Sequence, residues 1–339
     1  MNKKWNLYGI SESRGVLMGI ATLIVAFFHC YSYHFENIIS NNFIANVLNF
    51  LRKMGNIGVD IFLFLSALGL YFSFTKDSNI KNFYKKRIVR IIPSIIIVAS
   101  IYYLIRGVDV VSFIKGITLT SFYLDGVRDF WYFALIVVLY LLYPLLYKII
   151  DKKDLKGLLL LLLISIGSTV LMMYLLPGYY SKVEIALTRV PIFLIGMYIG
   201  KKVMLKKEIP EFTLVFFLIA FITCNIILFS CKISPYIYVR YIYCILGISI
   251  IFLISYIHSK IKSVKIDKFL VYMGTYSMEV YLIFEKLCLE VKKIKGIQIH
   301  NNFIFYTIMF VITMILSYLL KKLCDFITKS HKKSSVPTT

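Results

Sequence analysis

Residues 56–72, NIGVDIFLFLSALGLYF, form a long apolar run that holds a single charged side chain, Asp60. Such runs recur along the chain, and several approach the roughly 20 apolar residues that a helix needs to cross a bilayer. The chain of 339 residues is 59% hydrophobic and its mean hydropathy is +0.79, both far above the soluble average. The sequence therefore predicts a polytopic membrane protein.

Long apolar runs predict an all-α fold, because a membrane β-barrel would show alternating segments of about ten residues instead. We expect about ten transmembrane helices in a single domain over residues 1–328, followed by a basic, disordered tail at residues 329–339. The expected spans are residues 17–33, 59–74, 92–104, 130–150, 158–176, 190–204, 212–229, 236–257, 269–289 and 303–323.

The formal net charge of +22 can indicate a nucleic-acid partner, but the cations lie between the apolar runs, so we expect no nucleic acid as a partner. If the N-terminus is cytoplasmic, the cytoplasmic segments hold 26 of the 39 Lys and Arg residues. The positive-inside rule then predicts a multi-pass protein of the cell (plasma or inner) membrane with both termini in the cytoplasm. The six cysteines form no Cys-x-x-Cys pair, and we expect apolar fillers and no metal site.

Two ionisable residues lie near the outer ends of neighbouring expected spans. His29 lies about 18 Å along the first span, and Asp60 opens the second span, which returns inward. A buried ionisable group is costly in a bilayer and often marks a functional site. A carboxylate beside an imidazole raises its basicity, so the two residues fit a general base and its orienting partner. Alternatively, both are interfacial residues that meet headgroup water.

A basic cluster, NFYKKRIVRIIP at residues 82–93, leads into the third span from the cytoplasm. Arg87 and Arg90 are three residues apart and share a helix face, and Lys86 adds a charge beside them. Arginine offers phosphate oxygens a bidentate fork, so the cluster fits a phosphate site. It also fits a topology signal that binds anionic lipid headgroups.

Other polar residues are weaker candidates. Glu279 is a candidate for substrate binding, and it falls about ten residues into the ninth span, where a carboxylate must face protein or water. Arg14 precedes the first span and lies about 22 Å from His29 along a continuous helix, so it cannot touch that ring.

Three further residues are candidates for a substrate site. Arg189 lies at the expected outer face, and Trp131 and Tyr132 begin the fourth span, where they also fit an aromatic belt. Ser66 and Gly69 fit close helix packing better than chemistry.

Six stretches, in order and spacing, resemble the acyltransferase-3 family of integral membrane acyltransferases. They are MGIATLIVAFFH (18–29), GNIGVDIFLFLSALGLYFSF (55–74), FYKKRIVRIIP (83–93), WYF…LYLLYP (131–144), RVPIFLIGMYIG (189–200) and MGTYSMEVYLI (273–283). The resemblance implies about ten helices and transfer of an acyl group, usually acetyl, from cytosolic acyl-CoA to a hydroxyl of a cell-surface glycan or its lipid-linked precursor. It places the family's essential histidine at His29, its paired arginines at Arg87 and Arg90, and its Gly-Val-Asp turn at 58–60.

The chain departs from the family pattern at two places. Many members carry an arginine eleven residues before the histidine, where this chain has Met18, and Arg14 lies one turn earlier on the same face as its expected replacement. Many also carry a histidine soon after the YLI of the late helix, where this chain has Phe284 and Glu285.

These expectations combine into one mechanism. Acetyl-CoA binds as donor through Arg14 and the basic cluster at the cytoplasmic face, its pantetheine arm threads inward between helices that membrane lipids surround, and His29, oriented by Asp60, deprotonates the acceptor hydroxyl. Two other interpretations compete. One is a transporter of a glycan or lipid-linked sugar without acyl transfer, although we see no internal repeat of the kind that transporters often show. The other is a sensory or binding domain without catalysis.

Overall fold

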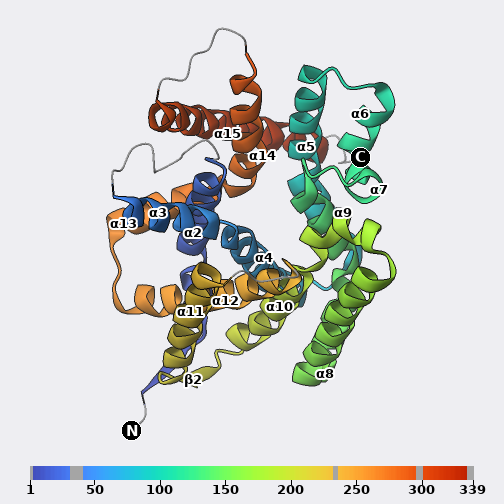
Figure 1. Ribbon diagram of the computed structural model, residues 1–339. Coiled ribbons are helices and arrows are strands. Elements are labelled where there is room, and N and C mark those ends of the chain that lie inside the picture. Colours follow the sequence, from blue (N-terminus) through green and yellow to red (C-terminus); the bar gives the residue numbers. More distant parts are fainter. Residues whose placement is uncertain (1–2, 31–40, 232–235, 295–300, 334–339) are drawn as a thin grey trace.

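The computed structural model describes residues 3–30, 41–231, 236–294 and 301–333 of the chain, which are almost entirely helical (Figure 1). Two short strands, β1 (Lys4–Asn6) and β2 (Glu208–Pro210), pair antiparallel. The helices are α1 (Tyr8–Glu12), α2 (Arg14–Phe28), α3 (Asn42–Met54), α4 (Ile57–Lys76), α5 (Ile80–Ile105), α6 (Val110–Ile117), α7 (Thr120–Asp125), α8 (Trp131–Leu175), α9 (Pro177–Leu187), α10 (Val190–Met204), α11 (Thr213–Ser230), α12 (Tyr236–Lys260), α13 (Val264–Thr275), α14 (Ser277–Lys292) and α15 (Asn302–Lys333).

The structure confirms the all-α fold of a polytopic membrane protein. Within the described residues, seven helical stretches are long and apolar enough to cross a membrane. They are Asn42–Lys76, Ile80–Ile105, Trp131–Leu175, Pro177–Met204, Thr213–Ser230, Ile237–Lys260 and Asn302–Thr328. Helix α2 is a shorter apolar helix of 15 residues. The count of ten spans stays a prediction.

Helix α8 contains both the fourth and the fifth expected spans. Its backbone leaves the helical region at Asp154, where φ is 50° and ψ is −126°. A Cβ atom on Gly157 would lie only 2.5 Å from the carbonyl oxygen of Ile149, although residues eight apart on a straight helix are about 12 Å apart. The chain therefore reverses here, and α8 is a pair of helices joined by a tight turn.

The ninth expected span, residues 269–289, is interrupted. Tyr276 has φ −108° and ψ 11°, so α13 ends at Thr275 and α14 begins at Ser277. Close packing of α13 on α2 accompanies the break, since a Cβ atom on Gly274 would lie 2.7 Å from the carbonyl oxygen of Gly15. The two half-helices can consequently direct their side chains to different neighbours.

Several helical segments lie outside the expected spans, among them α1, α3, α6, α7, α9 and the end of α15. Helix α3 begins at Asn41, whose side chain accepts hydrogen bonds from the amides of Phe43 and Ile44 and thus caps the helix. Helix α15 continues through Lys333, so residues 329–333 of the tail expected to be disordered are helical, whereas 334–339 lie outside the described residues.

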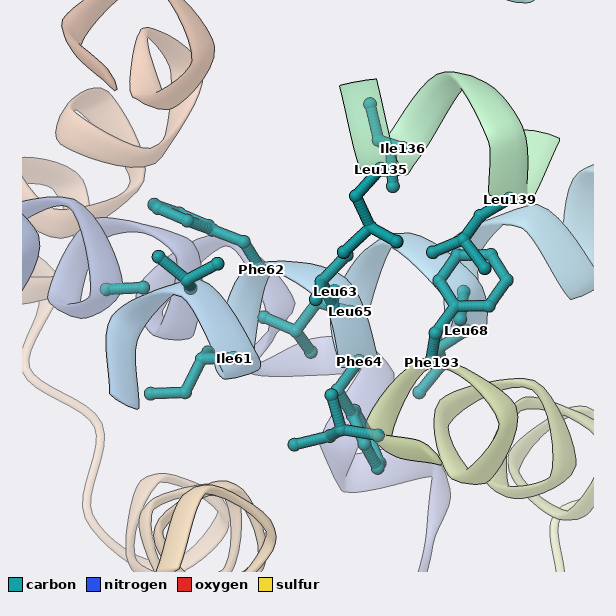
Figure 2. Close-up of a cluster of buried hydrophobic side chains, with 14 of the residues drawn as sticks. Ile61, Phe62, Leu63, Phe64, Leu65, Leu68, Leu135, Ile136, Leu139 and Phe193 are labelled. Carbon is teal, nitrogen blue, oxygen red and sulfur yellow. The ribbon is translucent and has the colours of Figure 1, made fainter. Parts of the chain in front are cut away.

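Helix α4 lies at the centre of the core and is buried on most of its circumference. Figure 2 shows its side chains among Leu135, Ile136 and Leu139 of α8 and Phe193 of α10. Helix α10 can approach α4 closely because Gly196 has no side chain; a Cβ atom there would lie 2.5 Å from the α4 backbone. A helix that is apolar all round is expected to be enclosed in this way, and α4 positions the elements around the site.

Segments expected on the same side of the membrane contact one another. On the expected cytoplasmic side, Lys202 pairs with Asp154 at 2.7 Å, and β1 pairs with β2. On the expected outer side, Arg106 pairs with Asp129 at 3.4 Å. These contacts agree with the expected grouping of segments on each side of the membrane. Which side is cytoplasmic stays a prediction.

Candidate active site

Three arginines meet in one cavity of about 310 Å³ between α2, α4, α5, α8 and α14. Arg14 comes from the first turn of α2, and Arg87 and Arg90 come from one face of α5. We call this space the arginine cavity. The cavity brings together Arg87 and Arg90, which share a helix face as predicted, and Arg14, the expected replacement for the family arginine. Met18, which stands where that family arginine would be, also lines the cavity.

Helix α4 leaves room for these guanidinium groups. A Cβ atom on Gly69 would lie 2.7 Å from an Nη atom of Arg14, so only glycine admits the group in this position. Arg87 donates a hydrogen bond to the Ser73 hydroxyl at 3.2 Å, and the hydroxyls of Ser66 and Tyr140 interact at 3.0 Å within the lining. Ser66 and Gly69 therefore serve this cavity, beyond the helix packing expected of them.

The positive charge of the arginine cavity is not balanced by ion pairs within the described part of the chain, and Glu279 interacts with Arg90 only at longer range. None of the acidic residues in the described part of the chain forms an ion pair with Arg14, Arg87 or Arg90. Like charges gathered in one cavity raise the local concentration of anions, and three guanidinium groups suit the oxygens of phosphate. The cavity is consequently a candidate anion site.

Lys86, the third cation of the basic cluster, is not among the residues that line the cavity. Its Nζ atom lies 2.8 Å from Asp77 Oδ2, and its side chain is 52% exposed. The hydrogen bond from Lys86 lowers the pKa of the Asp77 carboxyl. Lys86 thus belongs to a surface ion pair at the turn between α4 and α5.

His29 ends helix α2, and its imidazole faces helix α14. Its Nδ1 atom lies 3.2 Å from Glu285 Oε1, and Glu285 Oε2 accepts a hydrogen bond from Lys286. If Nδ1 carries the proton that points to this carboxylate, Nε2 is the ring nitrogen with the lone pair. The expected partner was Asp60, so the structure corrects this assignment: Glu285 is the carboxylate beside His29.

A small pocket of about 10 Å³ lies beside this pair. We call it the histidine pocket; its lining residues are Thr22, Val25, Ala26, His29, Phe62, Ser277, Val280, Tyr281, Phe284 and Glu285. Phe62, Ser277 and Tyr281 also line the arginine cavity. The two spaces therefore share a wall, with guanidinium groups on one side and the imidazole on the other.

Asp60 belongs to a separate buried cluster. Its Oδ1 atom lies 3.3 Å from Arg189 Nε, and both side chains are almost completely buried. Arg189 also donates hydrogen bonds to Asn56 Oδ1 at 2.6 Å and the Ile185 carbonyl at 2.9 Å, and it lies over the Trp131 ring at 4.9 Å. Both Arg189 and Trp131, which were candidates for a substrate site, are thus engaged in joining α4, α8 and α10.

Two further candidates lie closer to the arginine cavity. Tyr132 lines it and packs against Tyr281, with ring centroids 5.0 Å apart. Glu279 is 5% exposed and lies in the first turn of α14, because the expected span is broken at Tyr276. Its carboxylate interacts electrostatically with Arg90, which places it toward the arginine end of the site.

Glu285 and Tyr281 are site residues that were not predicted from the sequence. A signal for them exists, since Ser277, Tyr281 and Glu285 recur every four residues and so share one face of α14. All three line the histidine pocket.

Comparison with known proteins identifies a family. The family model of acyltransferase-3 proteins, described as the Acyltransferase domain, matches residues 16–322. This range contains the shared wall and every site residue above except Arg14. Neither the curated proteins nor the solved structures give a match.

Proposed function

The chain belongs to the acyltransferase-3 family and is an acyltransferase-type membrane protein, and we propose that it transfers an acetyl group from acetyl-CoA to a hydroxyl of a cell-surface glycan or its lipid-linked precursor. The wall shared by the arginine cavity and the histidine pocket carries this proposal. An acyl donor whose phosphates bind the arginines can place its thioester beside His29 by passing Phe62, Ser277 and Tyr281.

The arginine cavity is the donor half of the proposed site. CoA carries several phosphate groups at one end and the thioester at the other, so its two ends need different surroundings. Arg14, Arg87 and Arg90 supply positive charge, and no described carboxylate forms an ion pair with them. Arg14 and His29 lie about 22 Å apart along α2, which matches a long, narrow donor that binds with its charge at one face of the membrane.

The His29–Glu285 pair is the half of the proposed site where the acyl group is transferred. The Nε2 atom of His29 removes the proton of the acceptor hydroxyl as that oxygen attacks the thioester carbonyl. The new C–O bond forms, the C–S bond breaks, and the CoA thiolate leaves and takes up the proton. Glu285 holds Nδ1 and stabilises the imidazolium that exists between these two proton transfers.

The test is acetyl transfer by purified protein in membranes that contain the acceptor. We expect His29→Ala to slow CoA release by about 10²- to 10⁴-fold without weakening acetyl-CoA binding. His258→Ala is the matched control, because His258 pairs with Asp267 at 3.2 Å near the α12–α13 turn. A His29 variant that transfers acetyl at a rate near that of the wild type would refute the assignment of the base.

Mass spectrometry of surface glycans from cells with and without the protein identifies the acceptor. An acetylated species that disappears with the protein supports the proposal. If glycans lose their surface location but not an acetyl group, the protein is a transporter instead.

A further inference from the structure

An apolar groove lies on the far side of the histidine pocket. It has a volume of about 480 Å³ and is formed by α2, α3, α14 and α15. Leu23 and Phe27 of α2, Leu48 of α3, and Phe303 and Phe310 of α15 line it. The histidine pocket therefore lies between the arginine cavity and this apolar groove.

Among the described residues, only Ala26 and Phe284 line both the histidine pocket and this groove. Phe284 is 3% exposed, and its ring packs edge-on against Phe310 with centroids 5.8 Å apart. Ala26 contributes a single methyl group, so the bulk of the partition is the Phe284 ring. This ring directly precedes Glu285 in α14, and it is thus adjacent to the reactive pair.

The sizes of the two spaces differ greatly. The histidine pocket has about 10 Å³ of free space, which is enough for about one water-sized group. The methyl of an acetyl group is of this size, and each further methylene needs room that the pocket lacks. The groove behind Phe284 offers that room with apolar walls.

We propose that Phe284 sets the length of the acyl group by closing the histidine pocket against the apolar groove, so that the enzyme accepts acetyl and excludes longer chains. The proposal rests on the proposed function, in which the acyl group is delivered to His29. Removal of the ring joins the two spaces, and a longer acyl chain then extends past Ala26 into the groove between α2 and α15.

The test compares Phe284→Ala with the wild type, using acetyl-CoA, butyryl-CoA and octanoyl-CoA. CoA release is measured in vesicles from cells that produce the protein, with vesicles from cells that lack it as the blank. One methylene in an apolar pocket changes kcat/KM by about 10-fold or more. We therefore expect the wild type to prefer acetyl-CoA and Phe284→Ala to raise the octanoyl-to-acetyl ratio of kcat/KM by at least about 10-fold.

Two further variants keep the result interpretable. Phe303→Ala also removes a phenyl ring from the groove, but Phe303 does not line the histidine pocket. The octanoyl-to-acetyl ratio of this variant should therefore equal that of the wild type. Phe284→Leu removes less volume and should admit butyryl before octanoyl, and it serves if Phe284→Ala does not fold.

The outcomes separate the two levels of the proposal. A folded Phe284 variant that still transfers acetyl and still excludes butyryl overturns the role of Phe284, as does a wild type that uses octanoyl-CoA as readily as acetyl-CoA. Failure of the proposed function itself would appear differently, as no release of CoA from any of the three donors above the blank in vesicles that contain the wild type.

Discussion

Arginines lie in two contrasting surroundings in this protein, one buried and one open to a cavity. Arg189 is nearly inaccessible, and its guanidinium contacts Asp60, Asn56, a backbone carbonyl and the Trp131 ring. In the arginine cavity, by contrast, three guanidinium groups share an open space, and no described carboxylate pairs with them. A buried charge that is fully paired holds helices together, whereas unpaired like charges around a cavity await a ligand of opposite charge.

The largest effect is expected from breaking the Arg189 cluster. Arg189→Met leaves the Asp60 carboxylate buried without its partner, which typically costs about 3–5 kcal/mol of stability. Thermal unfolding in detergent should show a large loss of stability for Arg189→Met, and the double variant Arg189→Met with Asp60→Asn should regain most of that stability. Arg87→Gln is the contrasting variant; because it strands no buried carboxylate, an equal loss of stability there would remove the distinction between the two regions.

The next effect separates the two carboxylates by activity. Glu285→Gln keeps an acceptor for His29 but removes the charge that stabilises the imidazolium, and we expect acetyl transfer to fall by about 10²-fold or more. Acetyl-CoA binding should not change. Asp60→Asn in a folded protein should slow transfer much less, and the reverse order would restore Asp60 as the partner of His29.

A smaller effect concerns single cations at the donor end. Arg14→Gln removes one charged hydrogen-bonding group, each of which contributes about 1.5–3 kcal/mol, so the Kd for acetyl-CoA should rise by roughly 10- to 100-fold. Lys86→Gln should weaken the binding of acetyl-CoA by less than about 1 kcal/mol, because Lys86 lies in an exposed ion pair with Asp77 and does not line the cavity. Titration of both variants with acetyl-CoA measures the difference; equal losses would mean that Lys86 also contacts the donor.

The smallest effect tests the space that α4 leaves for Arg14. Gly69→Ala places a methyl group against the guanidinium, which must then shift, and we expect acetyl-CoA binding to weaken by about 1 kcal/mol. Gly167→Ala in α8 is the matched control, because nothing lies within 4 Å of a Cβ atom there. Equal affinities for the two variants would show that the position of Arg14 does not matter for binding.

Much of the fold was predictable because hydropathy and charge report membrane spans directly. The reversal within α8 follows from the charged residues between two apolar runs, and the shared face of Arg87 and Arg90 follows from helical spacing. The resemblance to the acyltransferase-3 family is confirmed over residues 16–322.

The pairing of His29 was not predictable in the same way. Depth along a helix is readable from the sequence, and it placed Asp60 and His29 at one level, but the rotation of each helix about its axis depends on packing. The glycines of α10 and α13 draw those helices close to α4 and α2, and the break at Tyr276 frees α14 to turn Glu285 toward His29. These contacts come from distant parts of the chain, so no local pattern around residue 29 contains them.

The most direct test of the central claim is the affinity of the double variant Arg87→Ala with Arg90→Ala for acetyl-CoA, compared with acetyl-pantetheine, which lacks the nucleotide phosphates. The wild type should bind acetyl-CoA far more tightly than acetyl-pantetheine, with an affinity that falls as salt rises. The double variant should lose that preference while it remains folded and binds acetyl-pantetheine as before. An unchanged Kd for acetyl-CoA would contradict the claim and return the arginines to a role in membrane topology.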